Sequence, residues 1–361
     1  MEIPQGYKTL LRIFFLLFSI YLFFLSITLL GNSLKFLGEG FAENLMITTS
    51  SPFIGLFIGI LCTSIIQSSS TTTCILIGIV SGGAISVENA IYIVMGANIG
   101  TTVTNGLVSL AHISRNQEFR RAFSASVVHD FFNIMAVIII FPFQYFTNFL
   151  GKTAGYLGNL FENAGGLKFA NPIKVITEPV NGVIENLASQ NGILLIIISL
   201  FILFFALRNM VKTIKKLVID KVENLFDKVI FNTPIRAFLF GLVLTAVVQS
   251  SSITISLVIP LAGAGVLTLY QVFPYALGAN LGTTVTALLA ACASNNISAI
   301  VVAFAHLIFN FTGILVIYPF RKIPIFLAKK FAEKSTEKKY FVIAYIITLF
   351  FIIPVLLIYL F

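Results

Sequence analysis

Long apolar segments dominate the hydrophobic pattern of this chain, and short polar stretches separate them. An α-helix rises about 1.5 Å per residue, and the hydrocarbon core of a bilayer is about 30 Å thick. Apolar segments of about 18 residues or more are therefore predicted to cross a membrane as helices. The clearest predicted spans cover residues 13–30, 87–112, 192–209, 269–293 and 340–361.

Two apolar segments are too short to span in this way. Residues 53–66 and 235–248 would each reach only about 20 Å as a helix, and each is followed by polar residues. We therefore predict that each segment stops partway through the bilayer and returns as a re-entrant helical hairpin. Irregular backbone at that depth is tolerated only where protein or a wet cavity surrounds it.

The polar residues that follow these short segments belong to duplicated motifs. Gln-Ser-Ser-Ser occupies residues 67–70 and 249–252, and Gly-Ala-Asn-x-Gly-Thr-Thr-Val-Thr occupies residues 96–104 and 278–286. Each motif recurs after 182 positions (249 − 67 and 278 − 96). Polar groups at membrane depth are costly unless they line a site, and paired motifs are typical of secondary transporters built from two repeats. The second motif also predicts a break within its helix.

A third matched pair completes the repeat. His129 and Asn133 correspond to His306 and Asn310, 177 positions later (306 − 129). We predict an all-α integral membrane protein with two inverted-topology repeats, each containing a re-entrant hairpin and a broken helix, plus one extra C-terminal transmembrane helix. The predicted units are repeat one at 1–147, an extracytoplasmic connector at 148–190, repeat two at 191–323, and an amphipathic segment with the last helix at 324–361.

The composition supports this fold class. The chain has 361 residues, of which 58% are hydrophobic and 10% are charged, whereas soluble domains carry roughly 25% charged residues. The net charge of +9 does not indicate nucleic-acid binding, because the basic residues gather at segment ends. Cys62, Cys74 and Cys292 lie scattered in apolar segments, which argues against a disulfide framework or a zinc site.

Lysines and arginines set the expected orientation, because cytoplasmic segments are enriched in them. The basic N-terminus and the basic stretches 208–236 and 321–339 are predicted to be cytoplasmic, whereas 34–50 and 148–190 lack this bias and are predicted to lie outside. The first helices of the two repeats then cross in opposite directions, as inverted repeats require. The chain is expected in the plasma (inner) membrane with a cytoplasmic N-terminus and an extracytoplasmic C-terminus. The amphipathic stretches Lys212–Lys228 and Lys329–Lys339 are expected along the cytoplasmic leaflet.

The Gln-Ser-Ser-Ser motifs are predicted to hold an anion. A half-helix should begin after each motif, at Thr71 and at Ile253, so that its free N–H groups and positive dipole end face the site. Hydroxyl and amide groups can donate to an oxyanion. The predicted substrate-binding residues are Gln67, Ser68, Ser69, Ser70, Thr71, Gln249, Ser250, Ser251, Ser252, Asn98 and Asn280.

Sodium prefers oxygen ligands, which broken helices supply as free carbonyls and threonine hydroxyls. Thr101, Thr102, Thr283 and Thr284 lie where such ligands are needed. The predicted core contains no Lys or Arg to neutralise an anion, so we expect co-bound cations to supply the balancing charge. Cation and anion binding would then depend on each other.

The polar residues also have plainer interpretations. Small polar residues commonly help membrane helices to pack, although that explains a duplicated Gln-Ser-Ser-Ser poorly. Asp130 is a functional-site candidate because carboxylates inside spanning segments usually have a role; alternatively it forms an ion pair with Arg120 or Arg121. The matched His129 and His306 favour a shared structural hydrogen bond over a proton relay.

Together these motifs resemble the type II sodium-dependent phosphate cotransporters. The resemblance extends over residues 50–145 and 235–322 and includes Phe119–Phe123 and His129–Asn133. It implies that the paired Gln-Ser-Ser-Ser segments form the substrate region with sodium sites nearby. By motif, it assigns sodium-site positions to Thr101, Asn133, Thr283 and Thr286. It also matches Asp130 to the aspartate that distinguishes electrogenic members from electroneutral ones.

This chain departs from the animal members at several positions. His112 and Arg115 replace a Gln and an Asp, and Ala279 replaces a Ser, so at least one sodium site is expected to differ from theirs. The full predicted sodium set is Thr101, Thr102, Asn133, Thr283, Thr284, Thr286 and Asp130. The resemblance also implies a homodimer, of which the sequence carries no direct sign.

The expected function is import of inorganic phosphate coupled to Na+ by alternating access, with net charge movement. The alternatives are a Na+-coupled carrier of another small oxyanion or a carboxylate, an uncoupled anion channel, and a membrane scaffold for phosphate signalling. The sequence shows no nucleotide-binding loop and no nucleophile–base pair, so an enzyme is not predicted. The expected partners are phosphate, Na+ and the lipid bilayer, not nucleic acid.

Overall fold

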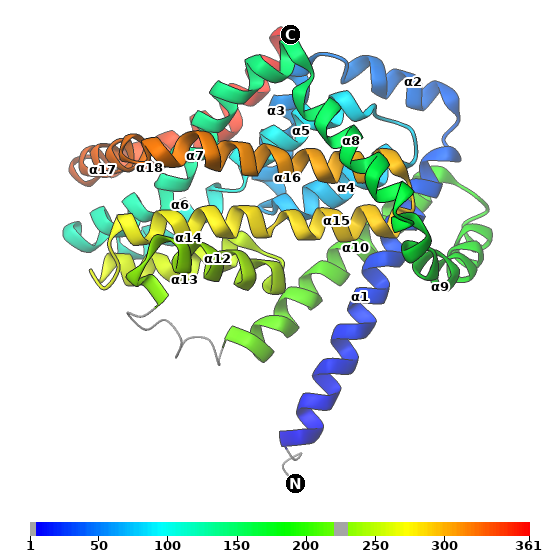
Figure 1. Cartoon of the computed structure of the whole chain (residues 1–361), viewed down its shortest axis with the longest axis horizontal. Coiled ribbons are helices and arrows are strands. Elements are labelled where there is room, and N and C mark those ends of the chain that lie inside the picture. The colour runs from blue at the N-terminus through cyan, green and yellow to red at the C-terminus, as the bar shows by residue number, and fades with distance from the viewer. Residues whose placement is uncertain (1–4, 220–229) are drawn as a thin grey trace.

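The structure is a computed structural model that describes residues 5–219 and 230–361. This part of the chain is helical and contains no β-strand (Figure 1). Seven of its helices are long and apolar enough to cross a membrane, which confirms the all-α membrane class. These spans are Thr9–Lys35, Val87–His112, Asn116–Thr147, Gly192–Leu217, Leu269–Ser294, Ile297–Phe320 and Tyr340–Leu360.

The two predicted hairpins are present and have matching lengths. The first consists of α3 (Pro52–Ile66) and α4 (Ser69–Ser81), and the second of α12 (Pro234–Val248) and α13 (Ser251–Gly263). In each hairpin the first arm has 15 residues and the second has 13. Arms of this length fall short of a bilayer core about 30 Å thick.

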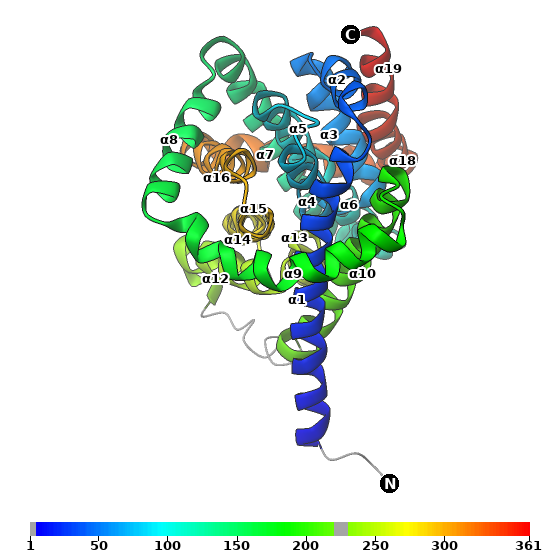
Figure 2. The same ribbon diagram turned by 90° about the vertical axis from the view of Figure 1, so that its right-hand side faces the viewer.

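The Gly-Ala-Asn motifs interrupt their helices less than we expected. The chain passes from α5 (Val87–Gly100) to α6 (Val103–Ser109) and, in the second repeat, from α14 (Leu269–Gly282) to α15 (Thr284–Ser294). The backbone at Thr101 (φ −60°, ψ −29°) and Thr283 (φ −66°, ψ −23°) stays in the right-handed helical region. Each broken helix therefore keeps one direction, and α14 and α15 follow nearly one line (Figures 1 and 2).

Glycines allow each hairpin to press against its broken helix. A Cβ atom at Gly96 would overlap the carbonyl oxygen of Leu56, and one at Gly278 would overlap that of Phe238. These glycines let α5 lie backbone to backbone on α3, and α14 on α12. Such small-residue contacts are typical of close helix pairs in membranes, and they fix each hairpin against a spanning helix.

The two repeats interlock. The first helices α1 (Gln5–Lys35) and α10 (Gly192–Ile214) pack against each other. The second hairpin arm of each repeat contacts the second half of the other repeat's broken helix, so that α4 meets α15 and α13 meets α6. This exchange of equivalent contacts places the hairpins between the repeats.

The remaining helices surround this centre. The long helices α7 (Asn116–Thr147) and α16 (Ile297–Ile317) close the two repeats, and α8 (Phe149–Asn163) packs on α16. The connector is helical throughout most of its length, and its second helix packs on α1 and α15. The other α-helices of the described residues are α2 (Glu39–Thr48), α9 (Gly166–Leu187), α17 (Lys322–Glu337), α18 (Tyr340–Ile347) and α19 (Ile353–Leu360).

The amphipathic segments are only partly described. Residues 220–229 of the basic stretch Lys212–Lys228 lie outside the described residues. In the other basic stretch, α17 packs against α7, with Arg120 3.5 Å from Glu333. The last span is not a uniform α-helix, because a π-helical turn at Thr348–Ile352 separates α18 from α19.

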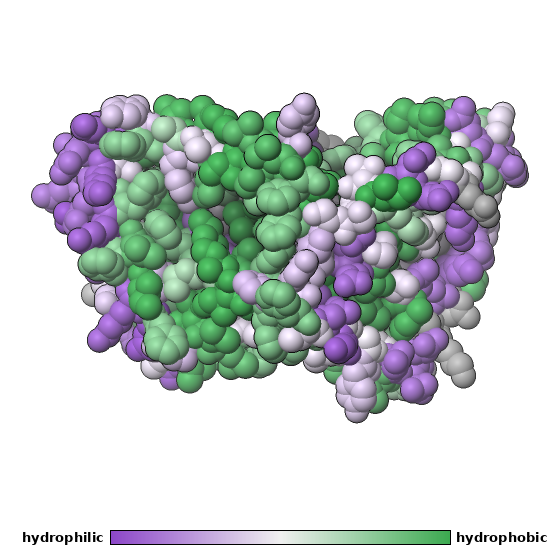
Figure 3. Space-filling model, turned by 90° about the horizontal axis from the view of Figure 1, so that it is seen from above, coloured by the Kyte–Doolittle hydropathy of each residue, from purple (hydrophilic) through white to green (hydrophobic). Residues whose placement is uncertain are grey.

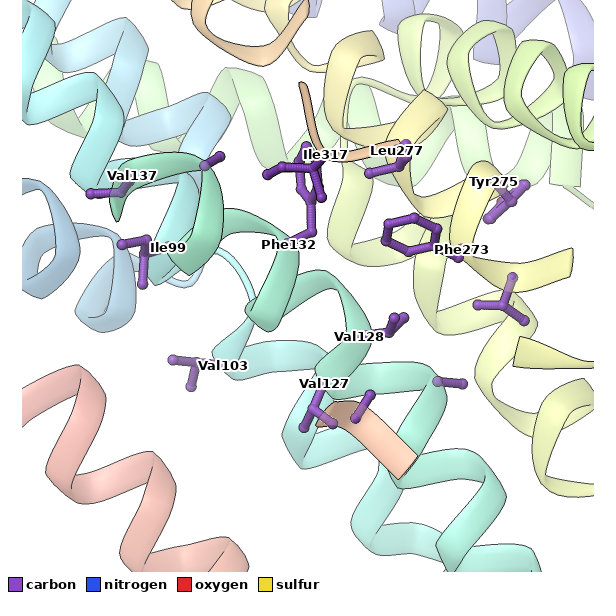
Figure 4. Packing of buried hydrophobic residues seen from close by; sticks show 14 of the residues in the cluster. Ile99, Val103, Val127, Val128, Phe132, Val137, Phe273, Tyr275, Leu277 and Ile317 are labelled. Carbon is purple, nitrogen blue, oxygen red and sulfur yellow. The ribbon is translucent and has the colours of Figure 1, made fainter. Parts of the chain in front are cut away.

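The core is centred on α7. Phe132 of this helix points toward Phe273 of α14, with ring centroids 6.2 Å apart, whereas Val137 and Ile99 lie on the other side (Figure 4). Side chains of both repeats thus share one hydrophobic cluster. On the outside, hydrophobic side chains spread over the middle of the face in Figure 3, with hydrophilic side chains toward its two ends. This surface suits a helix bundle immersed in lipid.

The Gly278 contact yields a stability prediction. Replacing Gly278 with Ala places a methyl group against the Phe238 carbonyl, a backbone group that cannot rotate away. We expect Gly278→Ala to lower stability by about 1–3 kcal/mol, the usual cost of overpacking. The measurement is the thermal unfolding midpoint of the purified protein in detergent.

The control is Gly155→Ala in α8, where an added Cβ meets no atom within 4 Å. This variant should unfold at or slightly above the wild-type midpoint, because Ala is the better helix former. Equal midpoints for the two variants would contradict the close packing of α12 and α14.

Candidate functional site

Both hairpins turn at their glutamine. Gln67 has φ 57° and ψ 27°, and Gln249 has φ 61° and ψ 24°. The following residues, Ser68 and Ser250, both have φ −153° and ψ 105°. The left-handed conformation is uncommon for a residue with a side chain and usually marks a constrained or functional position. The two motifs therefore fold into the same strained turn, as the duplication predicted.

Serine caps the helix that leaves each turn. Ser68 Oγ accepts a hydrogen bond from the Thr71 amide at 3.2 Å, and Ser250 Oγ accepts one from the Ile253 amide at 3.4 Å. A capping side chain satisfies one of about four free N–H groups at a helix N-terminus. The predicted starts of the half-helices are confirmed within two residues, since α4 begins at Ser69 and α13 at Ser251.

The two hairpin tips touch. Ser70 Oγ donates a hydrogen bond to the backbone carbonyl of Gln249 at 3.2 Å, and both residues are only 6% exposed. The Gln249 amide nitrogen contacts the Ala246 carbonyl, whereas its Oε1 is buried without a hydrogen-bond partner among the described residues. Residues 179 positions apart in sequence thus form one polar contact between the repeats.

A cavity of about 420 Å³ opens onto these tips. At about 30 Å³ per water molecule, it has room for a small anion with part of its hydration shell. The hairpins contribute hydroxyl and amide groups, and one face of α10 forms the opposite wall. The lining residues are Ile66, Ser68, Ser70, Thr71, Phe204, Leu207, Arg208, Val211, Lys212, Lys215, Gln249, Ser250 and Ile253.

This wall adds to one expectation. We expected no Lys or Arg in the core, and none is buried among the residues whose burial is described, but the exposed Arg208, Lys212 and Lys215 line the cavity beside the serines. The sequence placed these residues at the end of a spanning helix, where basic residues are ordinary. Their spacing of four and then three residues puts them on one helical face, but only the structure shows that this face looks onto the hairpins.

Asparagines tie the repeats together behind the tips. Asn280 donates to Asn310 Oδ1 at 2.8 Å and to Asn133 Oδ1 at 3.3 Å, and Asn133 donates to the Asn98 carbonyl at 2.8 Å. All four side chains are 1% exposed or less. We predicted Asn98 and Asn280 as substrate ligands, but neither lines the cavity. Asn310 was overlooked, although the repeat pairs it with Asn133.

The threonines predicted to bind sodium are buried, and most of their hydroxyls bond to their own helix. Thr101 donates to Ala97 O at 2.9 Å, Thr102 to Ile99 O at 2.9 Å and Thr284 to Leu281 O at 2.7 Å. Thr283 likewise donates to Asn280 O, whereas Thr286 Oγ1 is buried without a partner among the described residues. Their oxygens remain able to accept a cation.

Asp130 does not form the ion pair with Arg120 or Arg121 that the sequence offered as an alternative to a functional role. Arg120 pairs with Glu333, and Arg121 donates to the Gln117 carbonyl. Asp130 Oδ2 instead accepts a hydrogen bond from Tyr345 at 2.9 Å, and Oδ1 is buried without a partner in the described part of the chain. Tyr345 lies on α18, outside both repeats, so no symmetry in the sequence marked it.

The matched histidines differ in their contacts. His129 Nε2 lies 3.3 Å from Asn133 Nδ2, whereas neither ring nitrogen of His306 has a partner among the described residues. The expectation that both form one shared structural hydrogen bond is therefore wrong. Both asparagines accept from Asn280 through Oδ1, but only Asn133 contacts its histidine through Nδ2, and Asn310 Nδ2 has no partner among the described residues.

The predicted substrate residues thus divide into two groups. Five of them line the cavity and the remainder do not. The cavity residues are Ser68, Ser70, Thr71, Gln249 and Ser250. The others are Gln67, which is exposed, and Ser69, Ser251, Ser252, Asn98 and Asn280, which are buried.

Comparison with known proteins identifies the family. A family model described as Na+/Pi-cotransporter matches residues 22–169 and 202–320, which include both hairpins and both broken helices. The chain belongs to the Na+/Pi-cotransporter family. It is therefore a membrane transporter, not an enzyme. No solved structure matches this chain.

Several curated relatives match nearly the whole chain. The sodium-dependent phosphate transport protein 2A of Rattus norvegicus is 32% identical over 435 aligned residues, which is 98% of this chain and 68% of the relative. That of Ovis aries is 32% identical, covering 96% and 67%. The sodium-dependent phosphate transport protein 2B of Homo sapiens is 30% identical, covering 95% of this chain and 64% of the relative.

The asparagine cluster can be tested through stability. Asn280→Ala removes the donor to Asn310 and Asn133 and leaves their buried oxygens without it. We expect a loss of about 1–3 kcal/mol, the usual cost of an unsatisfied buried polar group. The thermal unfolding midpoint in detergent measures it.

Asn209→Ala on α10 is the matched control, because that amide bonds only to the carbonyl of its own helix at Phe205. Its midpoint should change little. A larger loss at Asn209 than at Asn280 would argue against the cluster as a link between the repeats.

Proposed function

We propose that this chain imports inorganic phosphate together with sodium across the inner membrane by alternating access between its two repeats. The contact between the hairpin tips carries the proposal. Two capped half-helices start at that contact and border one cavity, and helix N-termini favour anions. The relatives named sodium-dependent phosphate transport proteins support phosphate as the solute and sodium as the coupling ion.

The orientation follows from the basic residues. The cavity's charged wall, Arg208 to Lys215, lies at the end of α10 that the enrichment of basic residues on the inner side assigns to the cytoplasm. The N-terminus of α1 lies at the same side, and the paired contacts of α4 with α15 and α13 with α6 fit an inverted repeat. The structure then corresponds to a state in which the tips are reached from the cytoplasm.

Sodium is assigned to the neighbourhood of the broken helices. The predicted threonines, Asn133 and Asp130 offer oxygen atoms near the interruptions at residues 101 and 283. Asp130 brings a carboxylate that forms no ion pair with a Lys or Arg of the described residues. A cation beside its unpartnered Oδ1 would compensate that charge, so sodium binding at this position would carry charge across the membrane.

The serine contact gives the main test of the site. Ser70→Ala removes a hydroxyl from the cavity wall, and hydrogen bonds to charged groups are worth about 1.5–3 kcal/mol. We expect about a tenfold or greater rise in the phosphate concentration that half-saturates uptake. The measurement is uptake of radiolabelled phosphate into proteoliposomes with an inward sodium gradient.

Ser256→Ala is the control, because this α13 hydroxyl bonds to the Ser252 and Ile253 carbonyls at 2.7 and 2.8 Å and does not line the cavity. Replacement of sodium by choline should abolish uptake by the wild type. Uptake that persists in choline would favour an uncoupled anion channel, and arsenate, sulfate or carboxylates tested as competitors decide among solutes.

Charge movement is tested at Asp130. Asp130→Asn keeps the size of the side chain and removes its charge, so we expect less charge to move per phosphate. Current and radiolabelled uptake are measured together after a phosphate jump. Glu88→Gln, an exposed carboxylate in the first turn of α5, is the control and should leave the ratio unchanged. An unaltered ratio in Asp130→Asn would refute the assigned role.

A further inference from the structure

The wall of the cavity opposite the hairpins is a single helical face, formed by α10 and by Lys215, the first residue of the π-helical stretch Lys215–Ile219 that follows it. Phe204, Leu207, Arg208, Val211, Lys212 and Lys215 line it. Their spacings alternate between three and one, which is the pattern of one helical face. The face changes character along its length, from apolar at Phe204 and Leu207 to basic at the other end. Between Arg208 and Lys215 the helix advances about 10 Å.

This face carries positive charges that no acidic side chain of the cavity balances. The residues that line the cavity include Arg208, Lys212 and Lys215 but no Asp or Glu. Within residues 5–219 and 230–361, none of the three forms an ion pair. Clefts lined by one sign of charge concentrate ions of the opposite sign. The geometry therefore favours an anion beside this wall.

The hairpins alone leave a deficit of positive charge. Each half-helix presents the equivalent of about +0.5 charge at its N-terminus, so the two tips supply about one. Inorganic phosphate carries between one and two negative charges at neutral pH, because its singly and doubly charged forms coexist there. The missing positive charge is available within the same cavity from α10.

Basic residues are common at the ends of membrane helices, and a second, neighbouring cavity shows that those at the hairpins are a distinct set. Arg12 of α1 and Lys216 line that second cavity, which contains none of the hairpin residues. Lys212 borders both cavities, whereas Arg208 and Lys215 border only the one at the hairpins. The basic residues of α10 thus serve two distinct surfaces.

The equivalent positions of α1, the first helix of the other repeat, carry no basic residues. With the repeat offset of 182 positions, Arg208, Lys212 and Lys215 correspond to Ser26, Leu30 and Ser33 of α1. The inverted repeat would place these uncharged residues toward the other face of the membrane. The charge is therefore one-sided.

We propose that Arg208, Lys212 and Lys215 form an anion-binding wall that holds phosphate beside the hairpin tips when the cavity is open to the basic side. The wall raises the affinity for phosphate on that side alone. This inference rests on the proposed function. An anionic lipid headgroup offers the same phosphate chemistry, so the test separates the two sources.

The test uses a charge-matched pair of double variants. Arg208→Gln/Lys215→Gln removes two charges from the wall, and Arg12→Gln/Lys216→Gln removes an Arg and a Lys from the neighbouring cavity. Both are measured in right-side-out and inverted proteoliposomes made of zwitterionic lipid. The readout is the concentration of radiolabelled phosphate that half-saturates sodium-dependent uptake from each side.

For the wall variant we expect a rise of about tenfold on the basic side and less than about twofold on the other side. The wild-type affinity on the basic side should also weaken with added salt more than that of the wall variant, because screening acts on exposed charges. Normal affinity on the opposite side shows that the variant is folded. The control variant should match the wild type on both sides.

Equal shifts on both sides, or the same shift in the control variant, would overturn the proposal. A second series adds anionic lipid: if the wild type then loses its higher affinity on the basic side and the wall variant is unaffected, the wall binds lipid headgroups instead. If the wild-type protein takes up no phosphate from either side, the proposed function itself is wrong. If the wild type transports and the wall variant has the same affinities, only the proposal of an anion-binding wall is wrong.

Discussion

The contact between the hairpin tips is the constraint on which the rest of this structure depends. A hydroxyl of one repeat, Ser70, donates to a backbone carbonyl of the other at Gln249. That carbonyl is available because the chain turns there in the left-handed conformation and the next residue caps a new helix. Backbone so exposed at membrane depth needs a polar partner, and each repeat supplies it for the other.

Such a contact requires rigid support from both repeats. Glycines at 96 and 278 bring each broken helix against its hairpin, which fixes how far the tip projects. Behind the tips, the asparagine cluster joins α5, α7, α14 and α16 through side-chain amides. Amides suit this position because each can donate and accept. The same groups that satisfy one another also hold the two repeats in register.

The sequence predicted the features that follow from the repeat symmetry and from helix length. It did not predict contacts between elements that have no counterpart in the other repeat. The turns at Gln67 and Gln249 and the helix starts that follow were predictable, because a duplicated polar motif after a short apolar segment has few other solutions in lipid. The continuous direction through Thr101 was not, since the sequence alone does not show that this hydroxyl bonds to the Ala97 carbonyl of its own helix. Neither Tyr345 nor the basic face of α10 belongs to a duplicated motif, so only the folded structure shows what these residues contact.

The distribution of charge then separates the roles of the two halves of the site. Helix ends and hydroxyls at the tips are duplicated, and they can serve an anion equally from either side. The charges that break this symmetry are few: Asp130, held by a helix outside the repeats, and the basic residues of α10. A transporter with identical halves would treat both sides of the membrane alike. In this chain the two repeats are otherwise alike but carry different charges. The affinity on each side and the charge moved per cycle can therefore be changed independently, by substituting different residues.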